Sequence, residues 1–323
     1  MKPIHHTLLP LLLAFSPFAA AAAEPQPNPQ AEATYKDVQD TLGSVPTFIK
    51  LFPKESVAGA WAEMKALQLS KSTALDGRTK ELIGVAVASQ IPCRYCAYFH
   101  ESAAKANGAV DEEVREAVAV AAIDRNWSTV LNGNMTDESS FRRDADRISR
   151  NLGRTAKAPS NRESGMREAP TGQGNATGTT PPEEGLPDVV SGRATVEDVR
   201  RDVERTLGFF PSFMRSVPEA SLPGFWLETR QLLLSPNTRL SAKEKALIGL
   251  AVGAQTPDRF GIYYQTKAAQ AAGATEVELR EAIALAGVTR HWSTLLNGLR
   301  VDEPQFQRET DDIIGRMRQQ GGK

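Results

Sequence analysis

Apolar positions along this chain recur with the spacing of α-helices. The segment Lys80–Ala88 is mostly apolar, is rich in good helix formers and carries no turn signal. Between Asp111 and Asp124 the apolar positions share one helical face, and acidic residues occupy the first turn, where the helix dipole favours them. These apolar positions are Val114, Ala117, Val118 and Ala121. No stretch alternates convincingly as a strand would, so the pattern predicts an all-α protein.

A further helix is expected between these two segments. Pro92 suits the first position of a helix, because the N–H that proline lacks would have no partner there. The helix is predicted to continue to Ala106 and to stop at Asn107-Gly108, a typical C-terminal signal.

The chain contains an internal duplication. A shift of 165 positions brings two long segments into register without a gap. The matches include Trp61 with Trp226, Trp127-Ser128-Thr129 with Trp292-Ser293-Thr294, and Asn132-Gly133 with Asn297-Gly298. We therefore expect two tandem helical domains, at 35–151 and 195–316. Residues 152–194 between them are rich in Gly, Pro, Ser, Thr and Asn, which is typical of a flexible linker.

The two ends of the chain are expected to lie outside these domains. Lys2 precedes an uncharged run from Leu8 to Ala23, which ends in three alanines before Glu24, as in a signal peptide with its cleavage site. This run is short for a membrane-spanning helix, although an uncleaved anchor is the alternative. We expect a signal peptide at 1–23, tails at 24–34 and 317–323, a periplasmic or secreted protein, and no stable membrane insertion.

Composition narrows the function further. The formal charge is −1, with 38 basic and 39 acidic residues, whereas a general nucleic-acid binder needs an excess of Lys and Arg. Two cysteines are too few for a disulfide scaffold. No nucleic-acid partner is expected.

Both cysteines lie in one short segment that also contains a histidine. Cys93, Cys96 and His100 fall along one face of the predicted helix. The free N–H groups and positive potential of a helix start lower the pKa of a thiol there, and Arg94 would add to this field. His100, one turn after Cys96, can accept the thiol proton or hold a relay water, which favours Cys96 as the nucleophile.

Glu81 is the fourth candidate of this site. It opens an otherwise apolar helix, where a carboxylate is costly unless it is paired or protonated. Pairing with His100, or sharing a proton with a cysteine, would offset that cost. The second copy keeps the scaffold but loses all four groups: Ala246, Asp258, Gly261 and Gln265 replace Glu81, Cys93, Cys96 and His100. Their joint loss is expected if the four residues serve one activity.

The spacing Glu81-x11-Cys93-x2-Cys96-x3-His100 resembles the signature of alkylhydroperoxidase D-like proteins, in the carboxymuconolactone decarboxylase superfamily. The resemblance covers both repeats, about two thirds of the chain, although only the first carries the motif. It implies an all-helical fold, assembly into homo-oligomers, and a dithiol that reduces hydroperoxides through a sulfenic acid and then a disulfide. By this likeness Glu81 and His100 form the proton relay.

The same resemblance assigns the attack to Cys96 and its resolution to Cys93. Some family members have a second histidine between the cysteines, where this chain has Tyr95. No cofactor is implied; the partners would be a hydroperoxide and an unidentified thiol reductant. The decarboxylase branch does not rely on a dithiol, which counts against that activity.

Several alternatives remain open. The cysteines could form a structural disulfide, although closing so short a loop gains only about 2 kcal/mol. A zinc site would have enough ligands but would have to take three of them from one helix. The chain could also be a thiol–disulfide oxidoreductase acting on proteins, or a redox or metal sensor without enzymatic activity. The repeated Trp and Asn motifs occur in both copies, so we interpret them as packing or helix-end features.

Overall fold

The computed structural model describes residues 28–157, 187–189 and 191–321. Within these ranges every regular element is helical, which confirms the predicted all-α class. The first copy comprises α1 (Pro29–Leu42), α2 (Thr47–Lys50), α3 (Val57–Glu63), the π-helical segment η1 (Met64–Gln68), α4 (Gly77–Gln90), α5 (Arg94–Ala106), α6 (Asp111–Gly133) and α7 (Glu138–Lys157).

The second copy repeats this order. It comprises α8 (Val196–Leu207), the 3-10 segment η2 (Ser212–Ser216), α9 (Leu222–Glu228), the π-helical segment η3 (Thr229–Leu234), α10 (Ala242–Gln255), α11 (Arg259–Ala271), α12 (Glu276–Gly298) and α13 (Glu303–Gly321). Each element of the second copy from α8 onward lies at, or close to, the 165-residue offset found in the sequence.

Local sequence signals set many of the helix ends. The side chain of Asp76 caps α4 by accepting the backbone N–H of Thr79 at 2.8 Å, and Ser241 caps α10 in the same way. Helices α1 and α8 end at Gly43 and Gly208, whose φ angles of 79° and 82° lie in the left-handed region that favours glycine.

The helices extend beyond several boundaries expected from the sequence. Helix α1 begins at Pro29, inside the expected N-terminal tail 24–34, and α7 continues to Lys157, inside the expected linker 152–194. Helix α6 runs on to Gly133, and α13 runs to Gly321, beyond the expected domain end at 316. The apolar periodicity gave no clear signal at these added turns. The expected signal peptide 1–23 and residues 158–186 of the linker lie outside the described residues.

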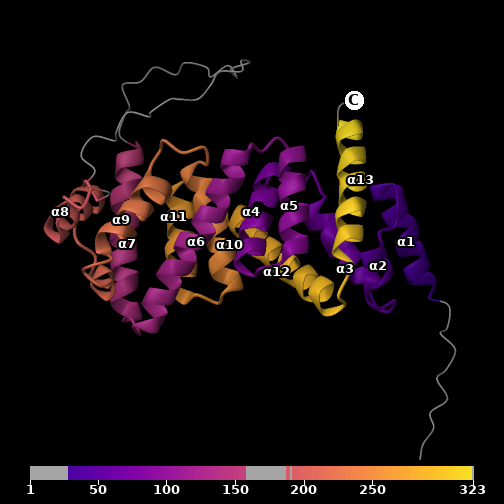
Figure 1. The fold of residues 1–323 in the computed structure, drawn as a ribbon, viewed down its shortest axis with the longest axis horizontal. Coiled ribbons are helices and arrows are strands. Elements are labelled where there is room, and N and C mark those ends of the chain that lie inside the picture. Colours follow the sequence, from indigo (N-terminus) through magenta and orange to yellow (C-terminus); the bar gives the residue numbers. More distant parts are fainter. Residues whose placement is uncertain (1–27, 158–186, 190, 322–323) are drawn as a thin grey trace, which may run out of the picture.

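The centre of the molecule is built from α4 and α6 of the first copy and from their counterparts α10 and α12 of the second. Helix α4 packs against α5, α6, α10 and α12, and α10 packs against α11, α12 and α6. Figure 1 shows α4, α6, α10 and α12 in the middle of an elongated molecule. Both α4 and α10 are buried on nearly all sides, which explains why their sequences are apolar almost throughout.

Reciprocal hydrogen bonds join the two copies across this centre. Glu116 of α6 accepts the backbone N–H groups of residues 239 and 240, each at 2.8 Å. The matching Glu281 of α12 accepts those of residues 74 and 75, also at 2.8 Å. The two copies are therefore related by an approximate two-fold arrangement in which each supports the loop before the other's central helix.

Each copy sends its last helix to the other copy. Helix α13 packs against α5 and α1 of the first copy, and α7 packs against α11 and α8 of the second. One core cluster accordingly joins the first three helices and both cysteines to Trp292, Phe306 and Ile313, and another joins Phe141 and Ile148 to the helices of the second copy. The two copies are thus one interlocked molecule, whereas the sequence suggested two domains in a row.

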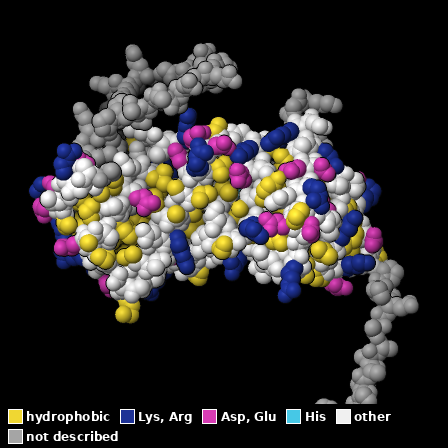
Figure 2. Space-filling view, in the orientation of Figure 1, with side chains coloured by type: hydrophobic (Ala, Val, Ile, Leu, Met, Phe, Trp, Pro, Cys, Tyr) yellow, Lys and Arg dark blue, Asp and Glu magenta, His cyan; other side chains and the backbone are white. Residues whose placement is uncertain are grey.

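The surface carries charges of both signs. Figure 2 shows basic and acidic side chains interspersed across this face, with apolar side chains between them. Among the described helices, none combines the length and the apolar character that crossing a bilayer requires.

Candidate active site

The two cysteines lie at the start of α5 and form a disulfide, with their Cα atoms 5.3 Å apart. Cys93 is the N-cap residue and Arg94 is the first residue of the helix, so Pro92 precedes the helix instead of occupying its first position as predicted. The cap is made by sulfur: Cys93 Sγ accepts the backbone N–H of Cys96 at 3.2 Å. A thiolate at this position would accept the same bond, and the helix start would stabilise its charge.

A second polar group from the other copy approaches Cys93. The side-chain amide of Asn297, on α12, donates to Cys93 Sγ at 3.6 Å and is itself oriented by Ser293. The Arg94 side chain, by contrast, is 80% exposed and pairs with Glu303 at 2.8 Å, and its contribution to the field at the thiols stays a prediction. The polar neighbour of Cys93 is an amide from α12.

Glu81 and His100 form a buried pair between α4 and α5. Glu81 Oε2 lies 2.7 Å from His100 Nδ1, and both residues are less than a tenth exposed. Gly84 allows this approach, because a Cβ atom added there would overlap the imidazole ring. The pairing of Glu81 with His100 that the sequence suggested is therefore present, and it leaves His100 Nε2 free to face the cysteines' side of the helix.

The other carboxylate oxygen of Glu81 has its own donor. Gln68, at the end of η1, donates from Nε2 to Glu81 Oε1 at 2.7 Å and is itself buried. The π-helical segment is held in place by the buried Lys80, whose ammonium donates to the backbone carbonyls of Leu67 and Ser70. Burial lowers the pKa of Lys80 below its ordinary value. Hydrogen bonds with Gln68 and His100, one to each oxygen, thus fix the orientation of the Glu81 carboxylate.

Thr289 of α12 lies between the histidine and the cysteines. Its hydroxyl is 3.4 Å from His100 Nε2, and its backbone carbonyl is 4.0 Å from Cys96 Sγ. One residue of the second copy therefore contacts both candidate groups of the first copy. The hydroxyl can donate to or accept from the imidazole, whereas the contact with Cys96 is made by the backbone carbonyl, which can only accept.

A cavity of about 40 Å³ adjoins Cys96. Cys96, His100 and Gln68 line it, whereas Cys93 does not. The remaining walls are mainly apolar and come from both copies: Phe48, Met64, Phe99, Val288, Thr289, Trp292, Leu296 and Phe306. The space beside Cys96 is therefore small, enclosed and apolar except at the predicted catalytic groups.

The structure brings all four predicted site residues together and adds three that the sequence analysis missed. Gln68, Thr289 and Asn297 were not selected, and Asn297 belongs to the motif that we interpreted as packing. Signals for two of them exist in the repeat comparison: Gln68 is matched by Leu233, and Thr289 by Asp124, so both change together with the thiols. Asn297 gives no such signal, because its counterpart Asn132 bonds to Asp258, the residue that replaces Cys93.

Tyr95, which takes the place of a histidine found in some family members, has a structural role. Its hydroxyl donates to the carbonyl of Val301 at 2.6 Å, and its ring packs against Phe306. Tyr95 therefore fastens the start of α13 to α5. In the described part of the chain, no group of three or more His, Cys, Asp or Glu side chains is arranged to hold a metal ion.

Comparisons with known proteins agree with this fold. The profile of the Carboxymuconolactone decarboxylase family matches residues 55–133 and 220–303, together about half of the chain. The chain belongs to this family and contains two alkylhydroperoxidase D-like copies of its fold.

Part of the chain is similar to a curated protein sequence. "Uncharacterized protein 4 in cox locus" of Paracoccus denitrificans is 38% identical over 95 residues, which cover 28% of this chain and 86% of that protein. No solved structure gives a significant match.

Proposed function

We propose that this protein is a thiol-dependent peroxidase in which Cys96 attacks a hydroperoxide and Cys93 resolves the product. The thiolate of Cys96 attacks the terminal peroxide oxygen, the O–O bond breaks, and the alcohol leaves after taking up a proton. Cys96 is then a sulfenic acid. The thiol of Cys93 attacks that sulfur, water leaves, and the Cys93–Cys96 disulfide forms. An external dithiol returns the two electrons and becomes a disulfide itself.

The observation that carries this proposal is the position of Cys96 in the enclosed cavity. Cys96 lines the cavity beside His100, whereas Cys93 lies behind it as the cap of α5. The cysteine that faces the cavity is the one that a small substrate reaches first. The Cα separation of 5.3 Å places the second sulfur within bridging distance of the first.

The buried network supplies the proton movements. In the proposal, His100 Nε2 accepts the Cys96 proton by way of the Thr289 hydroxyl or a water and later returns it to the leaving alkoxide. Glu81, held by Gln68, orients the imidazole and stabilises it when it is protonated. The same groups thus serve as base and acid in turn.

The cavity favours a small apolar hydroperoxide over a protein disulfide as substrate. Cys96 is only 3% exposed, and the walls around it are aromatic and aliphatic. A protein substrate would need an accessible sulfur, because thiol–disulfide exchange brings two sulfurs into direct contact. An organic hydroperoxide would bury its apolar body against the same walls.

Export of the protein is also part of the proposal. Its support is the apolar run from Leu8 to Ala23 and the alanines before Glu24. In an oxidising compartment the dithiol would rest as the disulfide and would need a dedicated thiol reductant, whose identity the sequence does not give.

Stopped-flow kinetics tests the proposal. The reduced protein is mixed with cumene hydroperoxide or with hydrogen peroxide, and dithiothreitol serves as the donor in turnover assays. We expect reaction at least about a thousandfold faster than with free cysteine, with the organic peroxide preferred. The Cys93→Ser variant should accumulate a sulfenic acid at Cys96, whereas Cys96→Ser should form none.

Two results of these experiments would contradict the proposal. A rate comparable to that of free cysteine would overturn the peroxidase and favour thiol exchange or redox sensing. A sulfenic acid in Cys96→Ser but not in Cys93→Ser would reverse the order of the two cysteines.

A further inference from the structure

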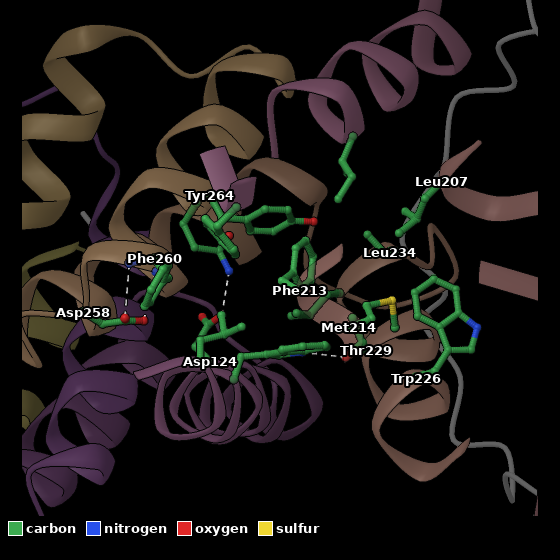
Figure 3. A pocket seen from close by; sticks show the side chains of 17 residues that line it. Asp124, Leu207, Phe213, Met214, Trp226, Thr229, Leu234, Asp258, Phe260 and Tyr264 are labelled. Carbon is green, nitrogen blue, oxygen red and sulfur yellow. Dashed lines mark hydrogen bonds between the residues drawn. The ribbon is translucent and has the colours of Figure 1, made fainter. Parts of the chain in front are cut away.

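The second copy contains a cavity at the position that corresponds to the thiol site. Its volume is about 60 Å³, against about 40 Å³ at the thiol site. It lies between α6 and α7 of the first copy and α8, η3 and α11 of the second (Figure 3). The second copy, which lacks both cysteines, therefore keeps a space at the position that corresponds to the cavity beside Cys96.

Aromatic side chains make up much of the wall of this cavity. The lining is mainly apolar, and no lysine or arginine is among the described residues that line it. The aromatic members are Trp127, Phe141, Phe213, Trp226, Phe260 and Tyr264. Figure 3 shows Asp124 and Asp258 toward one end and Met214 and Trp226 toward the other.

Asp124 is the polar group that this cavity leaves unsatisfied. It is 9% exposed, and its Oδ1 accepts from the amide of Gln265 at 2.6 Å. Its Oδ2 is buried and accepts no hydrogen bond from any described residue. Gln265 is the residue that replaces His100, and Asp124 occupies the position of Thr289. The second site has thus exchanged the histidine for an amide and gained a carboxyl on the opposite helix.

Two other polar side chains of the lining, Asp258 and Thr229, have hydrogen-bond partners. Asp258 accepts the backbone N–H of Gly261 at 2.9 Å and the side-chain amide of Asn132 at 2.8 Å, so it serves as the cap of α11. Thr229 accepts from Trp127 Nε1 at 2.9 Å and donates to the carbonyl of Phe225 at 2.8 Å. Only Asp124 Oδ2, within this lining, is a buried carboxyl oxygen that waits for a donor.

We propose that this cavity binds a small apolar organic amine whose ammonium group pairs with Asp124. Burial favours the neutral, protonated form of Asp124, and no cation is among the described residues of the lining, so a cation that enters with the ligand would stabilise the ionised form. The faces of aromatic rings attract organic cations, and the apolar walls accept the hydrocarbon part of such a ligand. A neutral alcohol of the same shape would fill the cavity but leave the carboxylate uncompensated.

The cavity adjoins a second hollow between α7, α10 and α11. Ile148, Tyr264 and Gln265 line both spaces. A ligand can therefore approach Asp124 from this side without crossing the thiol site, which lies at the other end of the molecule. The inference does not depend on the peroxidase activity proposed above.

Ionisation of Asp124 gives the proposal a measurable pH dependence. Burial, with a smaller contribution from Asp258, raises the pKa of Asp124 to about 7. The titratable groups near Asp124 are Asp258 and Tyr264, and burial raises the pKa of Tyr264 to about 12. Gly249 of α10 lies beside Asp124, and Thr229 of η3 lines the same cavity; neither titrates. An alkylammonium ion stays charged up to about pH 10. Amine affinity should therefore be highest between about pH 8 and 9 and fall about tenfold for each pH unit below 7.

Calorimetric titration of the full chain with phenethylamine and with phenethyl alcohol, at pH 8, tests the proposal. We expect the amine to bind at least about tenfold more tightly than the alcohol. Asp124→Asn should remove this preference and leave alcohol binding within about threefold. The double variant Cys93→Ser/Cys96→Ser should bind the amine as the wild type does, which separates this site from the thiol site.

Three results would overturn the proposal: no binding of the amine, equal binding of amine and alcohol, or an unchanged preference in Asp124→Asn. If Asp124→Asn fails to fold, Asp124→Thr, which introduces the residue found at the matching position of the first site, replaces it. The pH profile of the wild type decides independently, because a profile that stays flat between pH 5 and 8 contradicts an ion pair with Asp124.

Discussion

At the residue scale, the two copies differ in how they compensate their buried polar groups. The first copy buries Glu81 but surrounds it with two donors, from Gln68 and His100. The second copy has apolar residues, Ala246 and Leu233, at the positions of Glu81 and Gln68. The acid and the amide that holds it are thus absent together, as expected if neither is useful in the core without the other.

This correspondence predicts the behaviour of Glu81 variants. Glu81→Ala should lower the free energy of unfolding by about 1–3 kcal/mol, because Gln68 is left buried without an acceptor. The double variant Glu81→Ala/Gln68→Leu, which copies the second site, should recover part of this loss. Both variants should react with peroxide about a hundredfold more slowly than the wild type. Denaturant unfolding and stopped-flow kinetics measure the two effects separately.

The double variant is the control for this experiment. If it is no more stable than Glu81→Ala alone, the cost does not come from the unpaired amide. A wild-type rate in either variant would remove Glu81 from the proton relay.

At the scale of the element, the exchanged last helices complete the two cavities. Helix α13 contributes Phe306 to the thiol cavity, where the ring packs against Phe48 and Tyr95. Helix α7 contributes the matching Phe141 to the second cavity, where it packs against Phe213 and Phe260. The two rings have equivalent positions in the fold, but only one of them faces Cys96.

Alanine substitution of these two residues should separate stability from reactivity. Phe306→Ala and Phe141→Ala should each lower the free energy of unfolding by about 3–5 kcal/mol, because both rings are almost completely buried. Phe306→Ala should also slow peroxide reduction by about tenfold, since it loosens the wall beside Cys96. Phe141→Ala should leave the rate at 25 °C within about twofold. Equal rate losses in the two variants would mean that the effect is one of stability alone.

At the scale of the whole molecule, the copies share their cores. The central cluster contains residues of α4 and α6 together with those of α10 and α12, and each end of the molecule is closed by a helix from the other copy. A site assembled in this way requires both copies to be folded at once. The second copy supplies Thr289 and Asn297, so it is part of the thiol site as well as its support.

Thermal unfolding of the full chain should therefore be a single cooperative transition. Differential scanning calorimetry should give a calorimetric enthalpy close to the van't Hoff enthalpy. Phe141 lies far from the cysteines, but Phe141→Ala should lower the temperature at which the structure around them is lost by as much as it lowers the melting temperature of the whole chain. Thiol labelling during heating measures the loss of structure around the cysteines. Two separated transitions would contradict the shared core.

Much of this molecule could be predicted from the sequence because the relevant signals are local. The helices at Gly77–Gln90, Arg94–Ala106 and the start of Asp111–Gly133 follow from apolar periodicity, capping residues and the Asn-Gly signal. The motif located Glu81, Cys93, Cys96 and His100, because α4 and α5 are adjacent in the chain and pack together. The added turns of α1, α7 and α13 gave weaker sequence signals, and the expected boundaries there fell short of the helices.

The sequence by itself determined the class of fold, the duplication and the four chemical groups of the first site, since each depends on residues within one or two neighbouring helices. Tertiary structure decided which copy completes which site. Thr289 and Asn297 lie 189 and 204 residues from their partners His100 and Cys93, and no periodicity within one helix encodes a contact with another. The same crossing of helices left one carboxylate oxygen of Asp124, Oδ2, without a hydrogen-bond donor among the described residues, in the lining of an aromatic cavity. Residue spacing along the chain determines which side chains share a helix face, and packing between helices determines which residues that face contacts.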